Sequence, residues 1–198
     1  MGKVMVVAAV SVDGFIADPS DEVGPLFDFY DNGAVAIAPG DPERIFHVTE
    51  PTAAYMRESW TKIGACVIGR RLFDLTDGWG GRPAAGDHVF VVTHSAPTDW
   101  AFADGAPFTF VTDGVRSAVE QARTFAGDRD VTVTAGDIGR QVLDEGLADE
   151  VVLSMAPAVF GTGIRFFGEI AKPPLLLENP TVIEGDRVTH LIYPVRKG

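Results

Sequence analysis

Apolar residues follow two spacings along the chain, and each spacing predicts one kind of element. Residues 4–10 are continuously apolar and rich in valine, as is typical of a central strand covered on both faces. Shorter apolar runs predict further strands at residues 65–68, 88–93, 108–111, 131–134 and 150–155. Near the C-terminal end, two runs flank Gly185 and Asp186, which predicts a hairpin.

Helical spacing appears between these runs. Met56, Trp60 and Ile63 lie at i, i+4 and i+7, and Thr49 is placed to cap this helix. A second stripe consists of Val115, Ala118, Val119, Ala122 and Phe125. Two further helices are expected, one after Gly69 and one leading from the turn at residues 135–139 to a C-cap near Gly146.

Strands that alternate with helices, followed by consecutive strands, predict the fold class. We expect a three-layer α/β domain with a mostly parallel sheet and an antiparallel C-terminal edge. The length of 198 residues fits one domain, residues 1–198. Residues 13–48 read as a long irregular segment, of the kind that often forms a lid or binding loop, with a short helical turn at 26–31.

Composition narrows the possible partners. The formal net charge of −12 disfavours nucleic acid and anionic lipid as general partners, but it leaves room for a local basic pocket. No stretch approaches the roughly 18 apolar residues of a membrane span. The single cysteine, Cys66, lies in an apolar run and reads as a core residue, which suits a reducing cytoplasm. The four histidines lack metal-ligand spacing, so we predict no metal site.

Gly69, Arg70 and Arg71 follow a predicted strand and begin a predicted helix. A helix N-terminus favours anions, glycine allows close approach to the backbone, and guanidinium groups suit phosphate. The alternative is a surface arginine pair that bridges to some of the 28 acidic residues.

Two other strand ends carry comparable residues. Thr93, His94 and Ser95 end the run VFVVTH, and the turn Ala135, Gly136, Asp137, Ile138, Gly139 follows another strand. Each alone is more often an ordinary polar or tight turn than a site, but ligands of open α/β sheets bind at the carboxyl ends of the strands. Together the three corners predict one dinucleotide along this edge. Asp13 follows the first strand and is either a substrate anchor or proton donor, or a turn residue with Gly14.

Several motifs resemble those of one family, in the same order: SVDGFIA, VIGRRLFD, VFVVTH, AGDIGRQVLDEGLADEV and APAVFGTGIRFF. The chain resembles dihydrofolate-reductase-like proteins, in the branch related to the reductase domain of the bifunctional riboflavin-biosynthesis deaminase/reductase. The resemblance covers nearly the whole chain. It implies NADPH bound along the sheet edge, hydride transfer to a pteridine-, pyrimidine- or imine-like substrate, and a homodimer.

The resemblance also implies a role for each corner. Gly69, Arg70 and Arg71 match a phosphate site; Thr93, His94 and Ser95 match the segment beside the adenosine ribose and its phosphate; residues 135–139 match the pyrophosphate turn. Asp13 matches the acidic residue near the nicotinamide and substrate. The deaminase half is absent from this sequence, so we do not expect a complete bifunctional enzyme.

Three departures from the family pattern bear on this hypothesis. Leu72 stands where relatives often have a hydroxyl residue, the turn begins with Ala135, and Asp137 adds a negative charge near the expected pyrophosphate. If the Asp137 carboxylate caps its helix it does not oppose binding. The alternative functions are a non-catalytic nucleotide-binding or sensor protein on the same fold, and a reductase that uses flavin.

Overall fold

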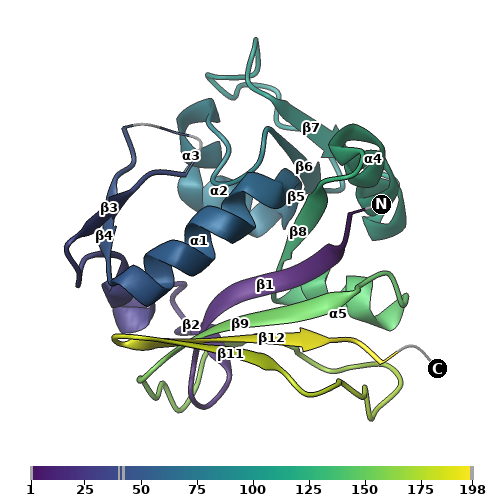
Figure 1. Cartoon of the computed structure of the whole chain (residues 1–198). Coiled ribbons are helices and arrows are strands. Elements are labelled where there is room, and N and C mark those ends of the chain that lie inside the picture. Colours follow the sequence, from purple (N-terminus) through teal and green to yellow (C-terminus); the bar gives the residue numbers. More distant parts are fainter. Residues whose placement is uncertain (1, 40, 42, 197–198) are drawn as a thin grey trace.

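The computed structural model describes residues 2–39, 41 and 43–196. Its largest element is a sheet of eight strands (Figure 1). Its strands, in chain order, are β1 (Val4–Ser11), β5 (Ile63–Gly69), β6 (His88–Val92), β7 (Phe108–Val111), β8 (Asp130–Thr134), β9 (Glu150–Ala156), β11 (Thr181–Gly185) and β12 (Val188–Pro194). Their spatial order is β11-β12-β9-β1-β8-β5-β6-β7. The six strands from β9 to β7 run parallel. β12 pairs antiparallel with β9, and β11 pairs antiparallel with β12. The predicted fold class is therefore confirmed.

Helices cover both faces of the sheet, which gives three layers (Figure 1). Ala65 and Val67 of β5 belong to an apolar cluster with α4 (Val115–Ala126) and α5 (Asp137–Asp144). Their neighbours on the strand, Cys66 and Ile68, pack on the opposite face with Phe73 of α2 (Arg70–Thr76). Because side chains alternate along a strand, one continuously apolar run supplies both cores. The helices α1 (Glu50–Lys62) and α3 (Gly78–Gly81) lie on the α2 side.

The segment at residues 13–48 is more regular than predicted. It contains β2 (Phe15–Ala17), β3 (Val35–Ile37) and β4 (Phe46–Val48), and β2 pairs with β10 (Ile164–Arg165). Strands of two or three residues are too short to show an alternating pattern, which is why the sequence did not reveal them. The predicted helical turn at 26–31 is confirmed as part of η1, a 3-10 helix at Gly24–Tyr30.

Local details of the predicted helices and turns differ. Thr49 occupies the N-cap position of α1, but its side chain makes no capping hydrogen bond. Phe125, placed on the buried stripe of α4, is 46% exposed, and Ala126 is buried instead. The hairpin turn lies one residue later than predicted, because β11 extends to Gly185 and β12 starts at Val188.

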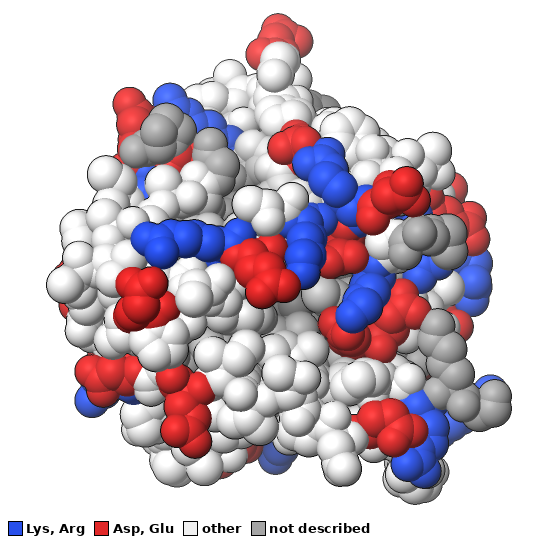
Figure 2. Space-filling view, in the orientation of Figure 1, with Lys and Arg blue, Asp and Glu red and all other residues white. Residues whose placement is uncertain are grey.

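Opposite charges are interspersed on the surface. On the face shown in Figure 2, lysine and arginine side chains lie beside acidic side chains and do not form one basic field. Arg82, for example, pairs with both Asp41 and Glu43. Among the described helices, none has the length and apolar character needed to cross a membrane.

Candidate functional site

The three predicted corners lie along one edge of the sheet. β5, β6 and β8 are parallel neighbours, with Gly69 opposite Val92 and Val67 opposite Val133. The segments that follow these strands therefore emerge on the same side. Two corners also touch, since a Cβ built on Gly69 would lie 2.9 Å from Cγ1 of Ile138.

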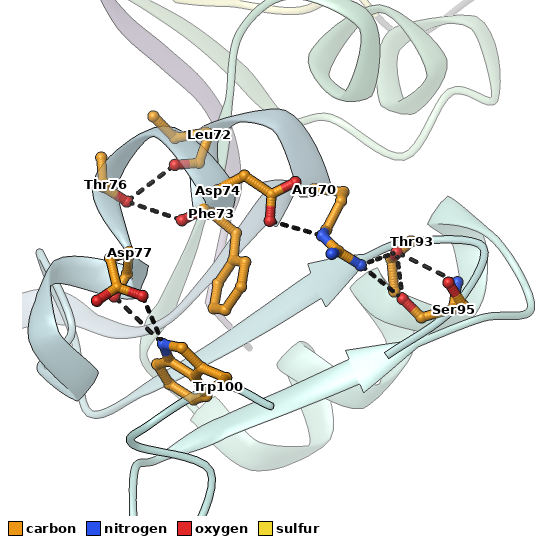
Figure 3. Close-up of polar contacts among 9 residues, drawn as sticks. All are labelled: Arg70, Leu72, Phe73, Asp74, Thr76, Asp77, Thr93, Ser95 and Trp100. Atoms are coloured by element: carbon orange, nitrogen blue, oxygen red, sulfur yellow. Dashed lines mark hydrogen bonds and ion pairs between the residues drawn. The ribbon is translucent and has the colours of Figure 1, made fainter. Parts of the chain in front are cut away.

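Arg70 joins the first corner to the second (Figure 3). Its Nη1 donates to the carbonyl oxygen of Ser95 at 2.8 Å and to Oγ1 of Thr93 at 3.4 Å, while Nε donates to Asp74 at 2.7 Å. Thr93 is buried, and its hydroxyl donates to the same Ser95 carbonyl at 2.9 Å. The guanidinium group is thus held over the end of β6. His94 is exposed, and among the described residues no hydrogen bond draws it into this cluster.

Arg71 points to a different part of the chain. Its Nε and Nη2 donate to the two carboxylate oxygens of Asp21 at 2.8 and 2.5 Å. The hydrogen bond from Arg71 lowers the pKa of Asp21, and the same contact raises the pKa of Arg71. For this second arginine, the alternative reading as an ion-pairing residue describes the structure.

The turn at residues 135–139 is tightly packed. Gly136 has φ of +85°, and its N–H donates to the carbonyl oxygen of Phe166 at 3.0 Å. Gly139 faces Val6 and the carbonyl of Thr134, so its lack of a side chain lets α5 pack closely on the sheet. The first N–H groups of α5, which begins at Asp137, have no partner in the helix's own bonding pattern.

Asp137 does not cap α5. Its carboxylate instead accepts from Arg140 and Gln141, each at 2.8 Å. The Arg140 bond holds the pKa of Asp137 below its ordinary value. The Asp137 carboxylate is therefore paired within the helix, although Arg140 is shared with Asp144 at 2.7 Å. Leu72 packs into the apolar cluster of α2 with Phe73, which explains a leucine at this position.

Asp13 fastens two loops together. Its carboxylate accepts from Oγ of Ser11 at 2.6 Å and from the N–H groups of Phe160 and Gly161 at distances from 2.7 to 3.2 Å. The Ser11 hydroxyl, followed by these backbone donors, lowers the pKa of Asp13. A cavity of about 250 Å³ lies next to this loop, with Val12, Pro157 and Arg187 in its wall.

Sequence reasoning missed some of these partners. Asp21 and the amides of Phe160 and Gly161 are far in sequence from Arg71 and Asp13, and their spacing carries no signal. A motif match could have drawn attention to the segment APAVFGTGIRFF, but it does not show which carboxylate accepts hydrogen bonds from the backbone N–H groups of this segment.

Comparison with protein families identifies the family to which this chain belongs. The family model of the RibD C-terminal domain matches residues 2–184. The chain belongs to this family. It is a family of oxidoreductases, and its match includes all three corners and Asp13. No curated protein matches the chain.

Solved structures show the same fold at low identity. A protein assigned to riboflavin biosynthesis from Shewanella sp. PV-4 is 20% identical, with a TM-score of 0.68 over 98% of this chain and 99% of that one. The diaminohydroxyphosphoribosylaminopyrimidine deaminase/5-amino-6-(5-phosphoribosylamino)uracil reductase of Thermotoga maritima is 16% identical, with a TM-score of 0.60 over 98% and 57%. Dihydrofolate reductase of Enterococcus faecalis, solved with NADP(H), is 16% identical, with a TM-score of 0.55 over 99% and 98%.

The residues of this RibD C-terminal domain at the edge are compatible with a phosphorylated nucleotide. Arg70 supplies a cation, and its contacts with Thr93 and Ser95 are to neutral oxygens. The α5 N-terminus offers backbone donors, and the Asp137 carboxylate beside them is paired with Arg140, which also pairs with Asp144. Among the described residues, no group of His, Cys, Asp and Glu is arranged to hold a metal ion.

Proposed function

We propose that this chain is an NADPH-dependent reductase that transfers hydride to a small, flat, conjugated substrate of pteridine, pyrimidine or imine type. NADPH, when bound, supplies the hydride, and the protein supplies position and charge. Membership of the oxidoreductase family supports this proposal, as does a fold shared with a reductase solved with NADP(H).

The observation that carries the proposal is Arg70 held between α2 and the end of β6. A guanidinium group in contact with Thr93 and Ser95 offers charge-assisted bonds to a phosphate at this corner. We assign the 2′-phosphate of NADPH to Arg70, Thr93 and Ser95, with Gly69 and His94 flanking it. The pyrophosphate is assigned to the turn formed by Ala135, Gly136, Asp137, Ile138 and Gly139.

Asp13 is proposed as the polar residue on the substrate side. Its lowered pKa favours the carboxylate at neutral pH, so we propose that it orients a water molecule that delivers the proton. The cavity beside Val12 and Arg187 gives space near this loop for a substrate group.

The experiment starts with the purified chain and follows nicotinamide fluorescence during titration with NADPH and with NADH. Turnover is then measured with 5-amino-6-(5-phosphoribosylamino)uracil and with dihydrofolate. We expect NADPH to bind more tightly than NADH and to be oxidised in the presence of one substrate. Binding without oxidation across a broad pterin and pyrimidine panel would favour the non-catalytic sensor, while absence of binding to either nucleotide would refute both functions.

Replacing Arg70 with Ala is expected to weaken NADPH by roughly 10-fold or more, the equivalent of about 1.5–3 kcal/mol for a charged hydrogen bond. NADH, which lacks the 2′-phosphate, should change little. Arg129→Ala is the matched control, because Arg129 forms an exposed pair with Asp87 just before β8, at the opposite edge of the sheet. An equal loss for both nucleotides in Arg70→Ala would contradict the phosphate assignment.

We further propose that residues 1–198 act as one reductase domain, as a homodimer in a reducing cytoplasm. The buried Cys66 thiol, whose pKa burial raises to about 11, is an inert core group that suits this compartment. Sedimentation equilibrium of the full chain measures the oligomeric state.

A further inference from the structure

Arg70 and Arg71 are adjacent in sequence, but they hold different parts of the molecule. We propose that Arg71 is a positioning residue, which fastens the turn at residues 18–22 to α2 through Asp21, and that only Arg70 of the pair reads the cofactor phosphate. The second half of this statement rests on the proposed function, whereas the first half does not.

The Arg71–Asp21 contact is two-pronged and partly shielded. Both carboxylate oxygens of Asp21 accept from Arg71, at 2.8 and 2.5 Å. The Asp21 side chain is only 16% exposed, although that of Arg71 is 68% exposed. A bidentate pair of this kind fixes the geometry of both partners and occupies two of the three guanidinium nitrogens, Nε and Nη2.

Hydrogen bonds within the turn at residues 18–22 fix the backbone on both sides of Asp21. Oδ1 of Asp18 accepts from the N–H groups of Ser20 and Glu22 at 2.6 and 3.0 Å, and the Asp18 N–H donates to the Glu22 carbonyl at 2.9 Å. Asp21 has φ of +69°, a left-handed conformation that Asp and Asn tolerate better than other side chains. The turn connects β2 to η1, so its attachment to α2 links the phosphate corner to the segment at residues 13–48, which the sequence predicts to be a lid or binding loop.

Arg70 is paired differently. Its ion pair with Asp74 is a single contact within α2, at i,i+4, and the Asp74 side chain is 53% exposed. Such exposed helical pairs are weak and yield readily to another anion. Its remaining contacts are to the neutral oxygens of Thr93 and Ser95. Charge is thus available at Arg70, whereas Asp21 neutralises Arg71.

The fastening is tested by hydrogen–deuterium exchange of the full chain without nucleotide. Asp21→Asn removes the charge and keeps a residue that tolerates positive φ. We expect amides of residues 14–31 to exchange about threefold faster in Asp21→Asn and in Arg71→Gln, in line with the strength of one partly exposed pair, and α4 to be unchanged. Glu58→Gln, which removes one acidic partner from an exposed pair with Lys62, is the control.

The division between the two arginines is tested by nucleotide affinity. Arg71→Gln should keep the ratio of NADPH to NADH affinity within twofold of wild type, whereas Arg70→Gln should lower that ratio about 10-fold or more. Tighter binding of NADPH or adenosine 2′,5′-bisphosphate by Asp21→Asn, or faster exchange at residues 18–22 when either is added, would overturn the proposal, because Arg71 would then exchange Asp21 for phosphate.

The two arms separate this inference from the proposed function. If wild type binds neither nucleotide, the proposed function fails, and the exchange experiment still decides whether Arg71 fastens the turn. Unchanged exchange in both single variants would refute the fastening whatever the nucleotide results are.

Discussion

At the scale of single residues, Asp13 shows how one carboxylate serves as an anchor and as a candidate site residue. Ser11 and two backbone N–H groups satisfy its oxygens, and these bonds favour the ionised form. Because the folded pKa is lower than the ordinary value of 3.8, the contribution of Asp13 to stability is present above that value and is lost as the pH falls through the folded pKa.

If Asp13 orients the proton-donating water, Asp13→Asn should reduce kcat by about 100-fold, because the amide is neutral and has one acceptor oxygen in place of two. The rate of the wild type, followed from pH 4 to 9, should show no titration that belongs to Asp13. Asp104→Asn, at an exposed position between β6 and β7, is the control. A wild-type ionisation near neutral pH that disappears in Asp13→Asn would show instead that Asp13 is itself the donor.

At the scale of elements, two glycines set how closely α5 approaches the sheet. A Cβ on Gly139 would lie 2.7 Å from Cγ1 of Val6 and 2.9 Å from the carbonyl oxygen of Thr134, which is backbone and cannot rotate away. A Cβ on Gly69 would meet a side chain instead, that of Ile138. The spacing of these glycines was visible in the sequence, but the atoms that they make room for were not.

Overpacking usually costs about 1–3 kcal/mol, and alanine gains roughly 1 kcal/mol over glycine in a helix, so Gly139→Ala is expected to destabilise the fold by a net amount of up to about 2 kcal/mol. Urea unfolding measures the change. Gly69→Ala should cost less, and Ile138→Ala in the same chain should relieve part of that cost, since it removes the obstructing Cγ1. Additive effects of Gly69→Ala and Ile138→Ala would show that the two residues do not make the predicted contact.

At the scale of the whole molecule, the parts that a sequence predicts are those that depend on local pattern. The valine run of β1 and the stripe of α4 revealed the core, and strands followed by polar turns placed Gly69, Thr93 and Ala135 at one edge. The pattern could not show that Arg71 turns to Asp21, because two polar residues 50 positions apart leave no periodic signal. Asp137 was ambiguous for a different reason, since capping α5 and pairing with Arg140 at i+3 both fit a position at the start of a helix, and the three-dimensional geometry decides between them.

Stability of the whole molecule also depends on a residue that local pattern does not single out. His190 of β12 is 1% exposed; its Nδ1 lies 3.0 Å from Oγ of Ser154, and its Nε2 is buried without a hydrogen-bond partner among the described residues. The rings of Tyr55 and Phe29 pack against it at centroid distances of 4.6 and 5.8 Å. Burial lowers the pKa of His190 from 6.5 to about 4.

The unfolded chain therefore binds a proton at His190 at a higher pH than the folded protein does. The contribution of neutral His190 to the free energy of unfolding is fully present above pH 6.5 and is lost as the pH falls toward 4. We expect His190 to account for about 2 kcal/mol of lost unfolding free energy between pH 8 and pH 5, given about 1.4 kcal/mol per pKa unit. Urea unfolding at both pH values should show this difference shrink in His190→Gln, which cannot titrate. His94→Gln, at an exposed position, should leave the wild-type difference intact. If His190→Gln loses as much unfolding free energy between pH 8 and pH 5 as the wild type does, the pH dependence belongs to other groups and not to His190.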